Sequence, residues 1–376
     1  MVSDDDLDAD EERSDPAETV VPAPRENPSL SGHEGAEEEL LQAFASGRLP
    51  HGLLITGPRG IGKATLAFRF ARFLLSQEAE PSTGGLFAQA LSTSLALPPE
   101  HPVFRRIASN GHADLLTVER GIDPKRKRER TEIVVQDTRA IAAFLRLTPA
   151  EGGWRIVIVD TADEMNRNAA NAVLKILEEP PNRAILILVS DNPGRLLPTI
   201  RSRCRRLALR PLTDAVVADL LGRYRADLSA SDRAALIELA EGSIGHAIEL
   251  AEEGGLALHR RLLDLLGRLS ELDGAELHAF AETVARWGSE DTFRVLAELL
   301  PATLARSIAK AAQSDAGAAG GGGEAALVKL MARRGLDRWV EVWEKIAELF
   351  AQADAVNLDR KQVVLNAFFA LEEAAR

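Results

Sequence analysis

The stretch GPRGIGKAT, residues 57–65, decides the fold because it stands between a short apolar run, HGLLIT (51–56), and a helical repeat of apolar residues. A glycine-rich turn from a strand into a helix is the setting in which proteins hold the phosphates of a nucleotide. Gly57, Gly62 and Lys63 stand at the spacing that such a loop requires. The stretch therefore predicts a loop descended from a nucleotide-binding one.

Each residue type of this loop has a separate task. The glycines let the backbone curl so that its N–H groups point inward. Lys63 would reach the β and γ phosphates, and the N-terminus of the following helix adds partial positive charge. The next residue should carry a hydroxyl for Mg²⁺, but it is Ala64. Thr65 cannot replace that hydroxyl, because one residue turns about 100° around a helix.

A second acidic position is needed for ATP hydrolysis at such a loop. WRIVIVD (154–160) is a nearly continuous apolar run, typical of a strand buried on both faces, and it ends in Asp160. Asp160 could hold Mg²⁺. The water-activating glutamate expected next is replaced by Thr161. We interpret Asp163 and Glu164 as solvated residues leading into a helix, with a relocated catalytic Glu164 as the alternative.

Strand and helix patterns alternate through the first part of the chain. This alternation predicts a parallel sheet with helices on both faces. The predicted strands are 51–56, 113–119, 154–160 and 184–190, and the predicted helices are 63–76, 135–147 and 166–179. Beyond about residue 210 the patterns are helical. The predicted divisions are a disordered acidic tail (1–28), an α/β core (29–209), a small helical lid (210–258) and a helical C-terminal domain (259–376).

Composition restricts the class of protein further. The 376 residues carry a net charge of −12, so contact with nucleic acid would have to be local or made by a partner. The single cysteine, Cys204, excludes a disulfide framework within the chain. The acidic start lacks the features of a signal peptide, and no run is long enough to span a membrane. We therefore expect a cytoplasmic protein.

Two longer motifs identify a family. DTADEMNRNAANAVLKILEEPP (160–181) and LVSDNPGRLLPTIRSRC (188–204) resemble the clamp-loader branch of the AAA+ ATPases, and NAVLKILEEPP and SRC are specific to bacterial DNA polymerase III clamp-loader subunits. The resemblance covers roughly residues 40–250. It implies an AAA+ α/β core with a parallel sheet and flanking helices, then a small helical lid, then an all-α collar domain that assembles subunits.

The family contains ATP-hydrolysing subunits and a non-hydrolysing one, and three departures favour the second. Ala64 stands for Ser or Thr, Thr161 for Glu, and Gly245, within GSIGHA (242–247), for a sensor arginine. The resemblance therefore implies a degenerate nucleotide site with no required cofactor and at most weak binding of ATP or ADP without hydrolysis. Its residues are Gly57, Gly60, Gly62, Lys63, Thr65 and Asp160.

The resemblance also gives Arg203, in the SRC motif, a role. In the family this arginine reaches the γ-phosphate of ATP in the neighbouring subunit, where a planar, permanently charged group suits the transition state. From the residues alone, Arg203 could equally belong to a basic surface run with Arg201, Arg205 and Arg206. Cys204 has no partner pattern for nucleophilic catalysis, so we interpret it as a packed residue.

One feature of the sequence departs from the family pattern, and another has two possible interpretations. Family members of this type carry a four-cysteine zinc module after the first helix, but residues 77–112 contain no cysteine, so we predict no metal site. His101 and His112 alone do not make one. The basic run KRKRER (125–130) is either a solvated loop or a contact with the DNA backbone.

The resemblance implies a part of the DNA polymerase III holoenzyme that is neither an ATPase nor a polymerase itself. Its implied partners are the gamma/tau ATPase subunits and the delta subunit in a hetero-pentamer, with the sliding clamp and primed DNA reached through the complex. Two alternatives remain: an active ATPase motor subunit, and a regulatory protein that binds nucleotide without hydrolysis.

Overall fold

A computed structural model describes residues 21–77, 94–122, 130–151, 153–286, 290–313, 322–355 and 358–376. The chain forms two compact units. The first comprises Met1–Ser229 and Ala240–Gly245, and the second comprises Ala230–Leu239 and His246–Arg376. The chain thus leaves the first unit, returns to it for six residues, and leaves again. The predicted division into four parts stays a prediction.

The first unit is built on a five-stranded parallel sheet with the strand order β2-β3-β4-β1-β5. Every residue of the three central strands is buried, which explains their continuous apolar sequences. Because the strands are parallel, their carboxyl ends meet at one edge, which gathers the residues after β1, β3 and β4. The strands are β1 (Gly52–Thr56), β2 (Leu115–Val118), β3 (Arg155–Val159), β4 (Ala184–Ser190) and β5 (Arg205–Ala208).

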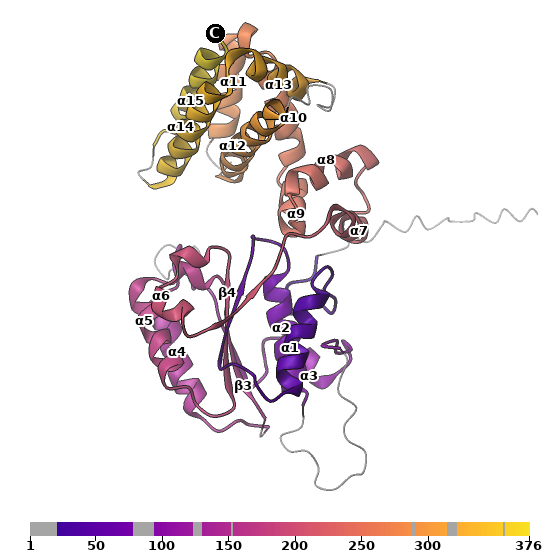
Figure 1. Ribbon diagram of the computed structural model, residues 1–376, viewed down its shortest axis with the longest axis vertical. Helices are drawn as coiled ribbons and strands as arrows, with labels where there is room; N and C mark the ends of the chain where they lie inside the picture. The colour runs from indigo at the N-terminus through magenta and orange to yellow at the C-terminus, as the bar shows by residue number, and fades with distance from the viewer. Residues whose placement is uncertain are drawn as a thin grey trace, which may run out of the picture. The chain divides into compact units, whose positions relative to one another are not determined.

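Helices cover both faces of this sheet and bury two apolar clusters (Figure 1). Leu53 and Ile55 point to one face and Leu54 to the other, as the period of two in a strand requires. The first face is covered by α1 (Glu34–Ala45), α2 (Lys63–Leu75) and α3 (Pro102–Ala108), and the second by α4 (Val135–Arg146), α5 (Arg167–Glu178) and α6 (Pro198–Arg201).

Short turns complete this unit near the carboxyl edge. Two 3₁₀ turns, η1 (Ala162–Glu164) and η2 (Pro193–Arg195), follow β3 and β4, and α7 (Asp214–Tyr224) follows β5. The returning segment 240–245 is fixed to the chain before α7, since Leu212 N–H donates to the Gly242 carbonyl at 2.9 Å.

The second unit is helical in its described residues. Its elements are α8 (Ala230–Ala240), α9 (Ile244–Glu252), α10 (Gly255–Gly267), η3 (Leu269–Glu271), α11 (Gly274–Ala285), α12 (Glu290–Ala312), α13 (Gly323–Arg334), α14 (Leu336–Ala355) and α15 (Arg360–Ala375). Trp339, Phe350 and Phe368 are buried, and the Phe280 and Phe368 rings meet edge to face with centroids 5.8 Å apart. Phe369, next to Phe368, is instead 48% exposed.

The predicted fold class is confirmed: an α/β core with a parallel sheet and flanking helices precedes an all-helical region. The seven predicted strands and helices correspond to β1, α2, β2, α4, β3, α5 and β4. Three helices and one strand of this core were not predicted, namely α1, α3, α6 and β5. The β5 sequence RRLA lacks an apolar run because three of its four residues face solvent.

Part of the predicted tail, residues 25–28, contacts α2. Arg72, almost fully buried in α2, donates to the carbonyls of Arg25 and Asn27 at 3.1 and 2.7 Å, and Arg69 donates to the carbonyl of Pro28. Buried guanidinium groups need acceptors, and these carbonyls supply them. The chain before α1 is therefore fixed against α2 although its own sequence is polar.

Some predictions fall beyond the described chain. Residues 1–20 of the predicted tail, 78–93 of the cysteine-free stretch and 125–129 of the basic run lie outside the described residues. Within the described ranges, no group of three or more His, Cys, Asp or Glu side chains could hold a metal ion. The same ranges contain no helix of the length and apolarity that a membrane span needs.

Candidate functional site

The glycine-rich loop lies at the carboxyl edge of the sheet, between β1 and α2. Gly57, Gly60 and Gly62 have φ angles of +151°, +75° and +101°, which side-chain-bearing residues rarely adopt. Gly62 is the N-cap of α2, so Lys63 is its first residue. The sequence thus specifies the loop through three glycines at positions where only glycine avoids backbone strain.

Lys63 does not face an open site. Its side chain is 3% exposed, and its Nζ lies 2.6 Å from Asp191 Oδ1 and donates to the carbonyl of Pro58. Asp191 directly follows β4, as Asp160 follows β3. The ammonium group that would hold a phosphate is therefore bound by a carboxylate of the same chain. Asp191 was not among the predicted site residues.

Asp160 lies at the same edge in an acidic surrounding. Burial and the negative charge of Glu119 raise the pKa of its carboxyl to about 6, and Asp191 adds to the effect. The Thr161 N–H, 3.0 Å from Asp160 Oδ1, and Lys63 act in the opposite direction. The fold thus brings the predicted site residues Lys63 and Asp160 together. Asp160 and Asp191 both interact with Lys63 there.

Asp163 corrects the sequence interpretation. It was expected to be solvated, but it is 8% exposed, and its two carboxylate oxygens accept the N–H groups of Asp191 and Asn192 at 3.1 Å each. The reason is that η1 folds back toward the end of β4. Glu164, the alternative catalytic residue, pairs with Arg120 at 3.1 Å. Asp163 therefore holds the backbone that presents Asp191.

The returning segment 240–245 covers the loop from another side. Ser243 Oγ donates to the Arg59 carbonyl at 2.7 Å, and Gly245 N–H donates to the Gly60 carbonyl at 2.9 Å. A Cβ at residue 245 would lie 2.7 Å from Gly60 Cα. A side chain at residue 245 would therefore displace the backbone of the loop, which Gly245 contacts directly.

The segment before α1 covers the loop from a third side. His33 is 6% exposed, and its Nε2 lies 2.7 Å from the Ile61 carbonyl. A Cβ at Gly62 would lie 3.0 Å from Leu30 Cδ1. Thr65, also predicted at the site, is buried in the first turn of α2. Protein atoms therefore contact the loop at Ile61, Gly62, Gly60 and Lys63.

Arg203 lies away from this loop, between α6 and β5. A Cβ at Gly52, the first residue of β1, would lie 3.3 Å from the Arg203 carbonyl, whereas the loop follows the last residue of β1. Five strand residues at about 3.3 Å each separate the two places by roughly 16 Å. Arg203 is therefore at the opposite edge of the sheet from Lys63.

Arg201, Arg205 and Arg206, which flank Arg203 in the sequence, are exposed as well. Arg205 pairs with Glu39 at 2.7 Å, and Arg206 Nε donates to Thr56 Oγ1 at 3.2 Å, so both connect to the α/β core. Arg203 is 38% exposed; its Nη2 lies 3.1 Å from Glu178 Oε1, and its Nη1 donates to the Thr199 carbonyl at 3.1 Å. Burial raises the pKa of the neighbouring Cys204 thiol to about 11, so this thiol is protonated at neutral pH.

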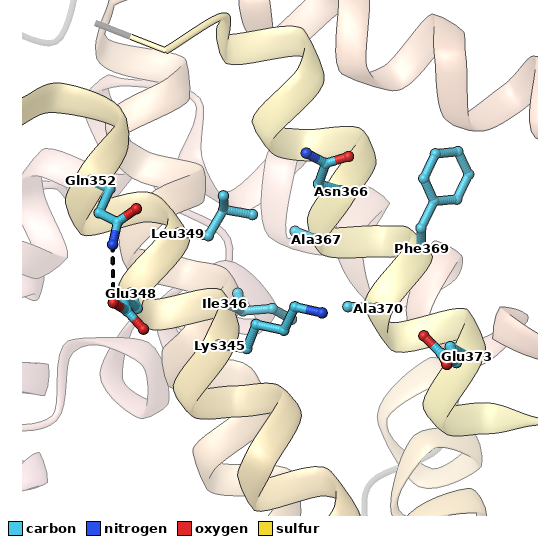
Figure 2. Close-up of a pocket in the computed structure, with 10 residues that line it drawn as sticks. All are labelled: Lys345, Ile346, Glu348, Leu349, Gln352, Asn366, Ala367, Phe369, Ala370 and Glu373. Atoms are coloured by element: carbon cyan, nitrogen blue, oxygen red, sulfur yellow. Dashed lines mark hydrogen bonds between the residues drawn. The ribbon is translucent and has the colours of Figure 1, made fainter. Parts of the chain in front are cut away.

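The second unit carries a groove of about 510 Å³ between α14 and α15 (Figure 2). Apolar side chains form its floor and polar ones its rim. Phe369 projects from α15 away from α14, and the Lys345 side chain extends from α14 toward α15. Its lining residues are Lys345, Ile346, Glu348, Leu349, Gln352, Asn366, Ala367, Phe369, Ala370 and Glu373.

The chain is similar in sequence to known subunits of DNA polymerase III. A DNA polymerase III subunit delta' from Pseudomonas aeruginosa is 36% identical over 194 residues, which cover 51% of this chain and 53% of that protein. The Escherichia coli subunit delta' is 32% identical over 213 residues, covering 57% and 58%. A gamma/tau subunit from Mycobacterium tuberculosis is 31% identical over 193 residues, covering 51% and 30%. The chain thus spans little more than half the length of these delta' relatives.

A solved Thermotoga maritima protein described as related to the DNA polymerase III gamma subunit aligns over 90% of this chain and 99% of its own, with 19% identity and a TM-score of 0.43. The parallel sheet and the glycine-rich loop at its carboxyl edge define an α/β core of the phosphate-binding-loop type. Residues 32–213 match the family described as "DNA polymerase III, delta subunit". Over about half of its length the chain is similar to DNA polymerase III delta' subunits.

Proposed function

We propose that this chain is a non-hydrolysing clamp-loader subunit that supplies Arg203 to the ATP site of a neighbouring subunit. The observation that carries this proposal is a difference in accessibility: the loop at the carboxyl edge of the sheet is covered, whereas Arg203 at the amino edge is exposed. At the carboxyl edge, Lys63 is bound by Asp191 and Gly60 is covered by Gly245. At the other edge, Arg203 is accessible on the surface.

The residues at the two edges support both parts of the proposal, the lack of hydrolysis at the loop and the delivery of Arg203 to a neighbouring subunit. Hydrolysis requires Mg²⁺, and Ala64 provides no hydroxyl to hold it while Thr161 provides no carboxylate to activate water. These losses argue against an active ATPase. An arginine delivered in trans, in contrast, needs only a permanent charge, a planar set of donors and an exposed position. Arg203 has all three.

The proposed setting is a cytoplasmic hetero-pentamer with gamma/tau ATPase subunits and a delta subunit. The complex opens a sliding clamp with ATP and closes it on primed DNA, and this chain serves as its rigid member. The α14/α15 groove supports an assembly role for the second unit, because its apolar floor and exposed Phe369 offer a site for a helix of a partner subunit. No cofactor of its own is required in this proposal.

The test is steady-state ATPase activity of the reconstituted loader with clamp and primed DNA. We expect Arg203→Ala to lower turnover at the served site by at least about tenfold, since such arginines contribute about 10³–10⁵ in rate elsewhere. Lys63→Ala should leave turnover near wild type, provided that the variant is folded. Arg205→Ala is the matched control, because Arg205 is a half-exposed arginine two residues away. A damaging Lys63→Ala with a silent Arg203→Ala contradicts the proposal.

A further inference from the structure

Asp191 is placed where a nucleotide phosphate would meet the loop lysine. Its Oδ1 lies 2.6 Å from Lys63 Nζ, a charge-assisted contact of the kind that a phosphate oxygen would make. We propose that Asp191 is a built-in anion that occupies the phosphate position of the loop and excludes nucleotide from it. This inference rests on the proposed function and deepens it, because a loop that excludes nucleotide cannot hydrolyse it.

Burial makes an internal anion necessary. The Lys63 side chain is 3% exposed, and a buried ammonium without a compensating charge is strongly destabilising. Asp191 is 30% exposed, so the pair lies at the boundary of the unit with the lysine innermost. The Pro58 carbonyl accepts a second hydrogen bond from the ammonium. Lys63 is thus satisfied within the chain and has no unmet requirement for a ligand.

The position of Asp191 is fixed by the protein. The carboxylate of Asp163 accepts hydrogen bonds from the N–H groups of Asp191 and Asn192. These two bonds fix the backbone that carries Asp191. Asp163 is itself buried, which makes this support costly to displace. Asp191 is therefore carried on a fixed backbone at the end of β4, from which its carboxylate reaches Lys63.

Charge around the pair opposes a further anion. The negative charges of Glu119 and Asp191 both lie close enough to Asp160 to raise the pKa of its carboxyl. A triphosphate entering this edge would meet these carboxylates and would compete with Asp191 for the one lysine. Ala64 offers no hydroxyl for the Mg²⁺ that could relieve the repulsion. Removing the Asp191 charge removes the direct competitor.

The first experiment measures binding of inorganic triphosphate and of a fluorescent ATP analogue to the purified full chain, with and without Mg²⁺. We expect no measurable binding to the wild type and clear binding to Asp191→Asn, which keeps the size of the side chain. The gain should disappear in Asp191→Asn combined with Lys63→Met. Binding to the wild type as tight as to Asp191→Asn, or a folded Asp191→Asn that binds neither probe, overturns the proposal.

A thermal-unfolding cycle tests the same pair without any ligand. Lys63→Met and Asp191→Asn should each lower Tm by about 5 °C or more, because each leaves one partner without its counter-charge. The double variant should recover part of that loss, since replacing both charges removes the unpaired group. Purely additive losses would contradict the assignment. Both experiments use the isolated chain, so they can fail or succeed independently of the Arg203 experiment in the assembled loader.

Discussion

Arg203 and Glu178 pair across the surface between the end of α5 and the start of β5, with Nη2 and Oε1 3.1 Å apart. Glu178 is the last residue of α5, and it belongs to the LEEPP segment. The arginine that we assign to a neighbour's ATP site is thus held by its own chain in the isolated subunit. An exposed pair of this kind contributes only about 0–1 kcal/mol, so a neighbouring phosphate can displace Glu178.

This pairing predicts that Glu178→Gln leaves the fold intact and strengthens the action of Arg203 in trans. The affinity of the neighbouring site for ATP should rise by no more than about fivefold, which is the worth of an exposed pair. KM for ATP in the assembled loader measures the effect. Glu179→Gln, the adjacent exposed glutamate, is the control. A tenfold loss of turnover in Glu178→Gln would instead mean that Glu178 positions the arginine for catalysis.

Asp160 predicts an unusual dependence of stability on pH. Burial and Glu119 raise its folded-state pKa to about 6, while in the unfolded chain it ionises near the ordinary value of 3.8. Between these values the folded state binds the extra proton, so this group lowers stability as pH rises from about 4 to about 6. Asp160→Asn removes the effect and should stabilise the chain by up to about 3 kcal/mol at pH 7.5.

The measurement for Asp160 is a comparison of denaturant unfolding at two pH values. The advantage of Asp160→Asn over the wild type should be large at pH 7.5 and small at pH 4, since the wild-type carboxyl is protonated in the folded state at the lower pH. An advantage that grows toward low pH would show that the sign, and hence the assigned environment, is wrong.

Asp114 predicts a strong structural effect far from the loop. It is 1% exposed, its oxygens accept the N–H groups of Ala150 and Glu151 at 2.9 and 3.1 Å, and Arg155 lies 3.3 Å away. Asp114→Asn removes the charge that compensates buried Arg155 and should cost about 3 kcal/mol of unfolding free energy. Denaturant unfolding measures this loss. Glu151→Gln, which changes an exposed partner of Arg106, should stay within about 1 kcal/mol.

The α14/α15 groove predicts a separation between folding and assembly. Phe369→Ser removes a half-exposed aromatic side chain, so Tm of the isolated chain should change little. Affinity for the proposed gamma/tau and delta partners should fall at least about tenfold, because buried aromatic anchors dominate interface energetics. Phe368→Ala is the contrasting variant: it empties a fully buried position and should cost about 3–5 kcal/mol of stability. Unchanged assembly in Phe369→Ser would exclude the groove as an interface.

The sequence predicted what depends on local pattern. Continuous apolar runs identified the central strands, and the glycine spacing identified the loop with its left-handed backbone at Gly60 and Gly62. Because the strands are parallel, the residues that follow β1 and β3 lie at the same edge of the sheet, and this was enough to predict that Asp160 lies near Lys63. These inferences succeed because a strand buried on both faces and a glycine-only turn each leave a distinct signature in the chain.

The sequence did not predict what depends on contacts between distant segments. The pairing of Lys63 with Asp191 joins positions 128 residues apart, and its only sequence signal is an aspartate directly after a buried strand. The burial of Asp163 follows from the fold-back of η1, and the ordering of residues 21–28 follows from Arg69 and Arg72 in α2. In each case a polar residue is buried because a partner far away in sequence satisfies it.

The contact between Gly60 and Gly245 makes the proposed loss of catalysis hard to reverse. An arginine restored at residue 245 would place its Cβ 2.7 Å from Gly60 Cα and 3.3 Å from the Gly60 carbonyl oxygen. A glutamate restored at residue 161 would have to adopt the left-handed backbone that Thr161 has, with φ of +54°. Each step back toward hydrolysis would therefore disturb the backbone before it restored any chemistry. Under the proposed function, restoring hydrolysis to this subunit would therefore require rebuilding the backbone of the loop as well as replacing side chains.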